Sequence, residues 1–123
     1  MPNMSGSSSR RKGMTYENEV YKKLLEWAIE RGEDTEVYKQ NRSGYDGDDL
    51  LIKHRRSADA DPVSVSMECK NQKEMRLSSW IDQAVANAKQ DQVPLVVHKR
   101  RGVADVSEHY VTMRMKDFLQ LLE

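Results

Sequence analysis

The chain has 123 residues, 33% of them charged and 37% hydrophobic, and its 20 Lys and Arg residues balance 20 Asp and Glu residues. This length predicts one domain with one core, because a domain near this size buries roughly two thirds of the surface that its unfolded chain exposes. The zero net charge excludes a uniformly basic nucleic-acid-binding protein but not a basic patch. The single cysteine excludes an internal disulfide, and no apolar run approaches the roughly 18 residues of a membrane-spanning helix. We therefore expect a soluble cytoplasmic protein with no membrane partner.

The first twelve residues are rich in serine and end in the basic run Arg10-Arg11-Lys12. They contain no large apolar side chain other than methionine, which predicts a flexible basic tail over residues 1–12. The remaining residues, 13–123, then form the single folded domain.

Residues 15–31 have the periodicity of an amphipathic helix, since apolar side chains recur at every third or fourth position. These side chains are Tyr16, Val20, Leu24, Trp27 and Ala28. Thr15 is suited to be the N-cap, and Gly32 is a natural C-terminal stop. Glu17 then lies in the first turn of this helix, at the edge of the apolar stripe.

Three short strands are predicted next, over residues 37–40, 49–52 and 63–70. The glycines and the Asn, Ser and Asp residues of segment 41–47 predict a loop between the first two strands. The third strand alternates clearly between apolar and polar side chains. One face holds Val63, Val65, Met67 and Cys69, and the other holds Ser64, Ser66, Glu68 and Lys70.

The second half of the chain is predicted to form a helix, two strands and a terminal helix. They cover residues 77–89, 95–98, 109–115 and 116–122. Ser78 or Ser79 can cap the first of these helices. The order α-β-β-β-α-β-β-α predicts an α/β domain with a mixed central β-sheet flanked by helices.

Three carboxylates and one lysine carry the predicted chemistry. Glu68 and Lys70 share one strand face, about 7 Å apart by the strand rise. Asp49 begins the preceding strand, and Glu17 lies in the first helix. Hydrolysis of a phosphodiester needs a hard cation, and Mg²⁺ keeps several waters, so two or three carboxylates suffice to bind it. A lysine beside the metal can stabilise the developing charge or activate the attacking water.

Three segments carry a resemblance to a known family. Residues 12–17 read Lys-Gly-Met-Thr-Tyr-Glu, Ser43-Gly44 precedes Asp49-Leu50-Leu51-Ile52, and residues 67–70 read Met-Glu-Cys-Lys. These resemble the opening Lys-Gly-x-x-x-Glu, the Ser-Gly loop with its metal-binding aspartate, and the E-x-K strand of the PD-(D/E)XK nuclease superfamily. Within it, the chain is most similar to the archaeal-type Holliday junction resolvases and their phage relatives.

The resemblance implies a restriction-endonuclease-like fold and a Mg²⁺-dependent endodeoxyribonuclease, for which Mn²⁺ also serves. It implies a homodimer that resolves four-way DNA junctions by paired phosphodiester hydrolysis in recombination and repair, without a small-molecule cofactor. A phage-encoded member acts in the cytoplasm of its host. Glu17, Asp49 and Glu68 are the implied metal ligands, and they form the catalytic group with Lys70. We favour Asp49 because it directly precedes the strand residues; Asp48 is the alternative, and Asp46 is also near.

Basic and polar residues near the predicted site are candidate DNA contacts. They are Arg11, Lys12, Arg42, Ser43, Gln83, Lys99, Arg100 and Arg101. Contacts of this kind hold the phosphate backbone without reading the base sequence, so binding should weaken steeply with salt. Gln83 falls where several members of the resembled family place a glutamine near the active site.

Two other functions remain open at this point. One is a different nuclease of the same superfamily, such as a flap, nicking or restriction-type enzyme. The other is a catalytically inactive DNA-binding module of the same fold, against which the intact acidic residues and Lys70 count. Junction resolution needs two active sites related by a two-fold axis, so a monomer in solution would count against it.

Overall fold

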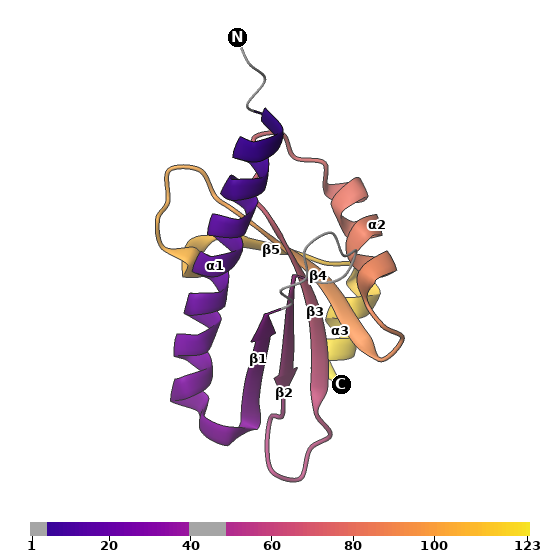
Figure 1. Ribbon diagram of the computed structural model, residues 1–123. Coiled ribbons are helices and arrows are strands. Elements are labelled where there is room, and N and C mark those ends of the chain that lie inside the picture. Colours follow the sequence, from indigo (N-terminus) through magenta and orange to yellow (C-terminus); the bar gives the residue numbers. More distant parts are fainter. Residues whose placement is uncertain (1–4, 40–48) are drawn as a thin grey trace.

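The computed structural model describes residues 5–39 and 49–123, and it confirms the predicted α/β class and the element order (Figure 1). The elements are α1 (Ser5–Arg31), β1 (Thr35–Lys39), β2 (Leu50–His54), β3 (Val63–Lys70), α2 (Leu77–Asn87), β4 (Gln92–His98), β5 (Tyr110–Thr112) and α3 (Met115–Leu122). Short 3₁₀ turns follow α1 at Gly32–Asp34 and precede β5 at Val106–Glu108. Gly32 has a φ of 83°, the left-handed conformation that lets a glycine end a helix.

The five strands form one mixed sheet in the order β1-β2-β3-β4-β5. β1, β2 and β3 are antiparallel neighbours, β3 and β4 are parallel, and β5 returns antiparallel to β4. The parallel pair is connected through α2, as parallel strands require a crossover. This arrangement is consistent with a restriction-endonuclease-like fold.

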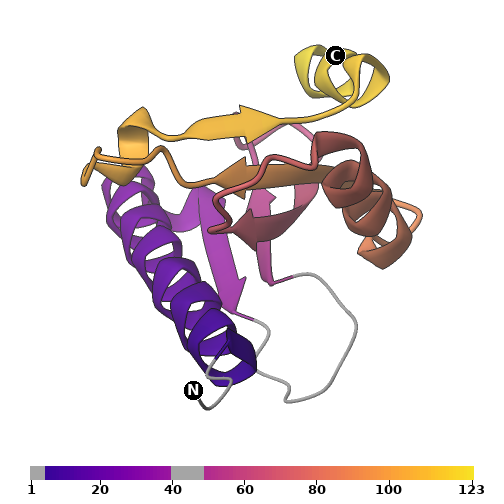
Figure 2. The ribbon, with the colours of Figure 1, turned by 90° about the horizontal axis from the view of Figure 1, so that it is seen from above.

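The two long helices cover opposite faces of the sheet (Figure 2). On the face under α1, called here the α1 face, Tyr16 and Val20 pack against alternate apolar residues of β2, β3 and β4. On the other, the α2 face, Trp80 and Ala84 pack against Val96 of β4. The predicted alternation of β3 is confirmed, because Val65, Met67 and Cys69 lie in the α1-face core and Glu68 does not. A strand that separates its faces in this way supplies core and polar site from one segment.

The first helix is longer than the sequence predicts. It starts at Ser5 instead of residue 15, so the structure places residues 5–12 in α1 where a flexible tail is expected. Adding a residue to an existing helix is far easier than nucleating one, and arginine and lysine are good helix formers. The basic run of residues 10–12 therefore continues α1 at its N-terminal end.

Smaller differences concern the ends of other elements. β4 begins at Gln92 and contains Pro94, whereas the sequence predicts a strand from residue 95. Pro94 is tolerated because β5 pairs with β4 at Val96, Val97 and His98, beyond the proline that lacks an N–H donor. Neither predicted serine caps α2: Arg76 occupies the N-cap position without a side-chain hydrogen bond.

Within residues 5–39 and 49–123, none of the helices combines the length and the hydrophobicity that crossing a bilayer requires. The longest, α1, carries charged residues between Arg10 and Arg31.

Candidate active site

Glu68 and Lys70 project from β3 onto the α2 face, where two polar residues of α2 meet them. The Glu68 side chain is only 2% exposed, and its Oε1 accepts a hydrogen bond of 2.8 Å from Nδ2 of Asn87. Lys70 Nζ donates a hydrogen bond of 2.7 Å to Oε1 of Gln83. The two residues of the E-x-K segment are thus held side by side, and the predicted Gln83 lies at the site.

Asp49 lies immediately before β2, next to the end of β3. Its backbone N–H donates to the carbonyl of Met67 at 3.1 Å, and its Oδ2 accepts the backbone N–H of Cys69 at 2.8 Å. Leu50 pairs with Met67 in the antiparallel register, so Asp49 lies beside Glu68 and Cys69 on the neighbouring strand. The carboxylate therefore satisfies a backbone donor that β2 does not reach, and it is brought to the E-x-K segment.

Glu17 reaches the same end of the sheet from α1. The pKa of Glu17 is raised to about 7, mainly by burial and also by the negative charge of Asp49, while the charge of Lys39 lowers it. Glu17 and Asp49 are therefore close enough to repel each other in a partly buried place. A cation bound between such carboxylates relieves this repulsion.

The charges of all four predicted catalytic residues act on the thiol of Cys69. Burial raises the pKa of this thiol, the negative charges of Asp49, Glu17 and Glu68 raise it further, and the Lys70 ammonium lowers it. Cys69 has a free thiol, and its small side chain is buried in the α1-face core. Glu17 approaches from the α1 face and Glu68 with Lys70 from the α2 face. The charge of Asp49 acts on Glu17, and Asp49 lies beside Glu68 on the neighbouring strand.

The chemistry of these donors fits a hard divalent cation. Carboxylate oxygens are what Mg²⁺ prefers, and one or two carboxylates suffice because the ion retains several waters. Within residues 5–39 and 49–123, no group of three or more His, Cys, Asp and Glu side chains lies close enough together to hold a metal ion. Asp49, just before β2, and Glu68 of β3 are the two of these carboxylates that lie side by side. Asp46 and Asp48, the alternatives to Asp49, lie outside the described residues.

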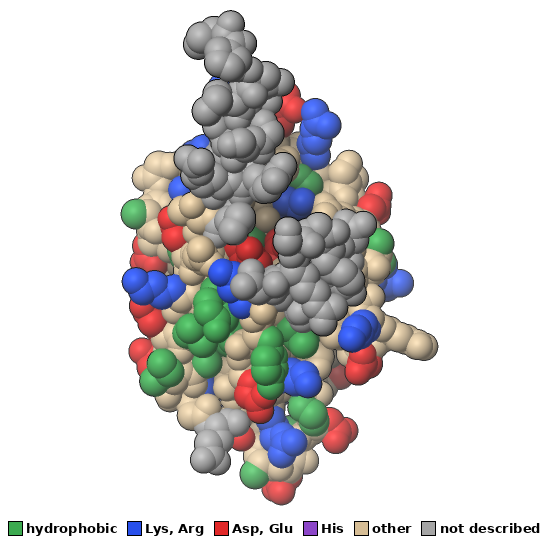
Figure 3. All heavy atoms as spheres, in the orientation of Figure 1, with side chains coloured by type: hydrophobic (Ala, Val, Ile, Leu, Met, Phe, Trp, Pro, Cys, Tyr) green, Lys and Arg blue, Asp and Glu red, His purple; other side chains and the backbone are tan. Residues whose placement is uncertain are grey.

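The basic segment after β4 begins next to Lys70. The backbone N–H of Lys99 donates to the Lys70 carbonyl at 2.9 Å, and Lys99 Nζ lies 6.0 Å from the ring centre of Tyr16. The Arg100 guanidinium lies 5.5 Å from the ring centre of Tyr110, and Arg101 is exposed. The face in Figure 3 shows Lys and Arg side chains interspersed with Asp and Glu and no single basic patch among its described residues.

The other predicted DNA contacts lie where the structure describes no side chain. Arg11 and Lys12 are in α1, but their side chains are outside the described part. Arg42 and Ser43 lie in the segment 40–48, which is outside it entirely. These four assignments stay predictions.

A buried hydrogen-bond chain anchors the helix turn that carries Glu17. The Nε2–H of His109 donates to the Val103 carbonyl at 2.7 Å, which leaves Nδ1 to accept the hydroxyl of Tyr16 at 2.9 Å. Tyr16 is 1% exposed, and burial raises the pKa of its hydroxyl. The segment after the basic run is thereby fixed to α1 beside Glu17.

Asn87 is a site residue that the sequence analysis missed. It follows Gln83 by four positions, which places both side chains on one face of α2. That spacing is the only signal in the sequence, and it becomes informative once Gln83 is placed next to Lys70. The hydrogen bond from Asn87 to Glu68 requires the docking of α2 on the sheet.

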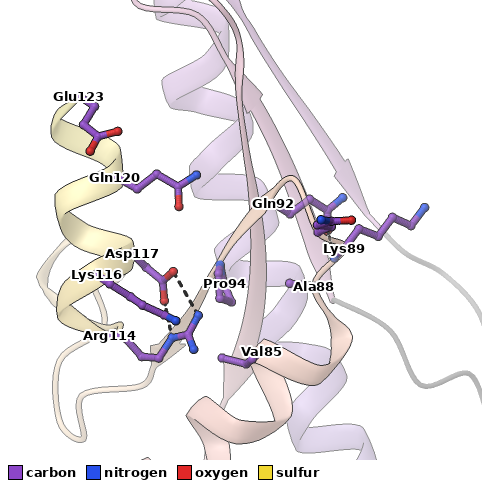
Figure 4. A pocket seen from close by; sticks show the side chains of 11 residues that line it. Val85, Ala88, Lys89, Gln92, Pro94, Arg114, Lys116, Asp117, Gln120 and Glu123 are labelled. Carbon is purple, nitrogen blue, oxygen red and sulfur yellow. Dashed lines mark hydrogen bonds and ion pairs between the residues drawn. The ribbon is translucent and has the colours of Figure 1, made fainter.

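Two hollows lie away from this group. A groove of about 560 Å³ runs between the α2–β4 connection and α3, beside Pro94 and the Arg114–Asp117 ion pair of 2.7 Å (Figure 4). An apolar pocket of about 320 Å³ lies on the α1 face, lined by residues such as Leu24, Trp27 and Ile52. None of the four predicted catalytic residues lines either hollow.

A mixed sheet that presents Glu-x-Lys on a central strand, with an aspartate from the adjacent strand, defines the class of PD-(D/E)XK proteins. Residues 8–122 match the model of the family described as "Phage putative PDDEXK endonuclease". The chain belongs to this family, and so to the PD-(D/E)XK superfamily, and the family description indicates an endonuclease. No curated protein and no solved structure matches the chain.

Proposed function

We propose that this protein is a Mg²⁺-dependent endonuclease that cuts four-way DNA junctions by paired hydrolysis, as a homodimer, with Mn²⁺ as a substitute. The observation that carries the hydrolytic chemistry is the Glu-x-Lys segment of β3, with Glu68 and Lys70 held on one face and Asp49 beside them at the start of β2. The preference for junctions rests on the resemblance of the three sequence segments to junction resolvases. The single cysteine excludes a zinc finger of the Cys₂His₂ type for base reading, which favours DNA structure as the target.

Each residue has a defined task in this proposal. Asp49 and Glu68 would hold the cation, and Glu17 lies near Asp49, where its charge acts on the site without making a three-carboxylate group. When bound, Mg²⁺ neutralises the phosphate and lowers the pKa of the attacking water. Lys70 donates one of its three N–H groups to Gln83. The other two can donate to a phosphate oxygen on which charge develops.

The basic residues hold the substrate. The backbone N–H of Lys99 donates to the Lys70 carbonyl, so the basic run begins beside Lys70. Lys99, Arg100 and Arg101 can therefore hold the phosphates that flank the scissile bond. Phosphate contacts of this kind fix the register of the DNA but carry no sequence information. Cleavage should therefore follow the shape of the DNA and weaken steeply as the salt concentration rises.

The test is cleavage of a synthetic four-way junction with Mg²⁺, beside linear duplex, a flap and a nicked duplex. We expect paired nicks in the junction and little cutting of duplex. Glu68→Ala and Lys70→Ala should lose cleavage and keep junction binding, whereas Lys73→Ala, at an exposed nearby lysine, should cut normally.

Each alternative function has its own outcome in the same assay. Equal cutting of duplex and junction, or a monomer by light scattering, would remove the junction assignment and leave another PD-(D/E)XK nuclease. Binding without any cutting in Mg²⁺ or Mn²⁺ would indicate an inactive DNA-binding module. Normal cutting by Glu68→Ala would overturn the site itself.

A further inference from the structure

Helix α2 makes two polar contacts with β3, and their spacing is matched. Gln83 and Asn87 are four residues apart on the helix, a rise of about 6 Å. Glu68 and Lys70 are two residues apart on the strand, a rise of about 6.6 Å. One turn of helix therefore spans the E-x-K segment, and Asn87 meets Glu68 while Gln83 meets Lys70.

The helix that makes these contacts is firmly placed. Ala84, between Gln83 and Asn87, is fully buried against the sheet, and Trp80 is 4% exposed. Both pack with Val96 on β4, the strand next to β3. Gln83 and Asn87 are thus presented to β3 from a fixed support, and a side chain held on a fixed support loses little entropy when it orients a neighbour.

Glu68 needs such a partner because it is almost completely buried. A carboxylate removed from water is costly unless donors reach it. The Asn87 amide supplies a donor at 2.8 Å, and this contact fixes the rotation of the Glu68 carboxylate. Partners that orient a metal ligand typically change metal affinity by about 10- to 100-fold when they are removed.

We propose that Asn87 is a positioning residue, which orients the Glu68 carboxylate so that Glu68 and Asp49 together bind a divalent cation. This inference rests on the proposed function, since it takes Glu68 to be a metal ligand. In the same way, Gln83 orients the ammonium of Lys70, which is not a metal ligand in this proposal. Asn87 therefore supports metal binding through Glu68, and Gln83 supports the stabilisation of charge on the phosphate through Lys70.

The experiment is calorimetric titration of the DNA-free protein with Mn²⁺ and with Mg²⁺. We expect Asn87→Leu to weaken cation binding by about 10- to 100-fold, and Gln83→Leu to bind the cation like the wild type while it cuts DNA more slowly. Raising the Mg²⁺ concentration should restore cutting by Asn87→Leu and not by Gln83→Leu. Asn87→Ala, with a smaller side chain and high helix propensity, serves if the leucine variant fails to fold.

The readouts separate the possible failures. Glu68→Gln should abolish most of the binding; if it binds like the wild type, or if the wild type binds no cation, the metal site of the proposed function falls and the positioning role falls with it. If Glu68→Gln loses binding and both Asn87 variants bind like the wild type, the positioning role alone is overturned. If the role of Asn87 were only structural, its substitution would lower the free energy of unfolding without changing the cation affinity. Urea denaturation of the metal-free protein measures this free energy directly.

Discussion

The two faces of the sheet have different compositions under the two helices. On the α1 face, ten buried residues from α1, β2, β3 and β4 form one continuous apolar core. On the α2 face, the buried apolar cluster has three members, and the buried polar residues Ser66, Glu68 and His98 lie on the same face of the strands. The α1 face therefore provides most of the hydrophobic stabilisation, and the α2 face presents Glu68 and Lys70 of the candidate site.

The first way to test this contrast is to remove the same side chain from each face. Leu50 is fully buried on the α1 face, and its neighbour Leu51 is half-buried and points to the other side. Leu50→Ala should lower the free energy of unfolding by about 2–5 kcal/mol, because it leaves a cavity in a packed core. Leu51→Ala should cost clearly less, and urea denaturation of both variants measures the difference. Equal costs would contradict the assignment of the core to one face.

A second prediction separates the two tasks of Asp49, which caps a backbone donor of β3 and belongs to the candidate site. Asp49→Asn retains an oxygen that can accept from Cys69, so it should fold like the wild type. It should nevertheless cut DNA at least about a hundredfold more slowly, because a charged ligand is lost.

Asp49→Ala provides the comparison, since it removes the acceptor as well. It should cut as poorly as Asp49→Asn and also lose about 1–3 kcal/mol of stability, the cost of an unsatisfied donor. Normal cutting by Asp49→Asn would transfer the metal-ligand role to Asp48 or Asp46.

A third prediction concerns the buried chain on the α1 side of the site. Tyr16→Phe removes the hydroxyl that donates to Nδ1 of His109 and leaves that buried nitrogen without its donor. The free energy of unfolding should fall by about 1–3 kcal/mol. Tyr110→Phe, at an exposed tyrosine, should change it little. An unchanged stability of Tyr16→Phe would show that the chain does not anchor α1.

The smallest expected effect is a pH dependence from the α2 face. His98 is buried, its Nε2 interacts with Thr112 at 2.8 Å, and its Nδ1 has no hydrogen-bond partner in the part of the chain that the structure describes. Burial lowers the pKa of His98 below 6.5, so the unfolded chain binds this proton more readily than the folded one. His98 therefore lowers the free energy of unfolding as the pH drops below 6.5, until the folded pKa is passed, whereas Glu17, with its pKa raised to about 7, contributes in the opposite direction over this range.

One proton contributes at most about 1.4 kcal/mol per pH unit to this slope. Compared with the wild type, His98→Gln should lose less stability as the pH is lowered from about 6.5 to 5, measured by urea denaturation at several pH values. It should not abolish the slope, because the pKa of His54 is lowered as well. An unchanged slope would show that His98 titrates in the folded protein as it does in the unfolded chain.

The sequence predicts most where period and spacing decide the structure. β3 has the predicted bounds, since its two-residue alternation is strict over all eight positions. Glu68 and Lys70 share a face for the same reason. The start of α1 is missed because a polar, serine-rich segment carries no periodicity that would show a helix. Contacts such as Asn87 with Glu68, or Asp49 with Cys69, depend on how α2 docks and on the register of β2 with β3, and no local pattern encodes either.

Pro94 has a consequence for the behaviour of the protein at high concentration. The strand before Val96 extends past the pairing with β5, so this stretch of β4 borders no strand of the described chain on its outer side. An open edge of that kind is a template on which a strand from another molecule can add. Pro94, in the middle of this stretch, offers no N–H donor to a strand added from another molecule, and this disfavours the growth of intermolecular sheets.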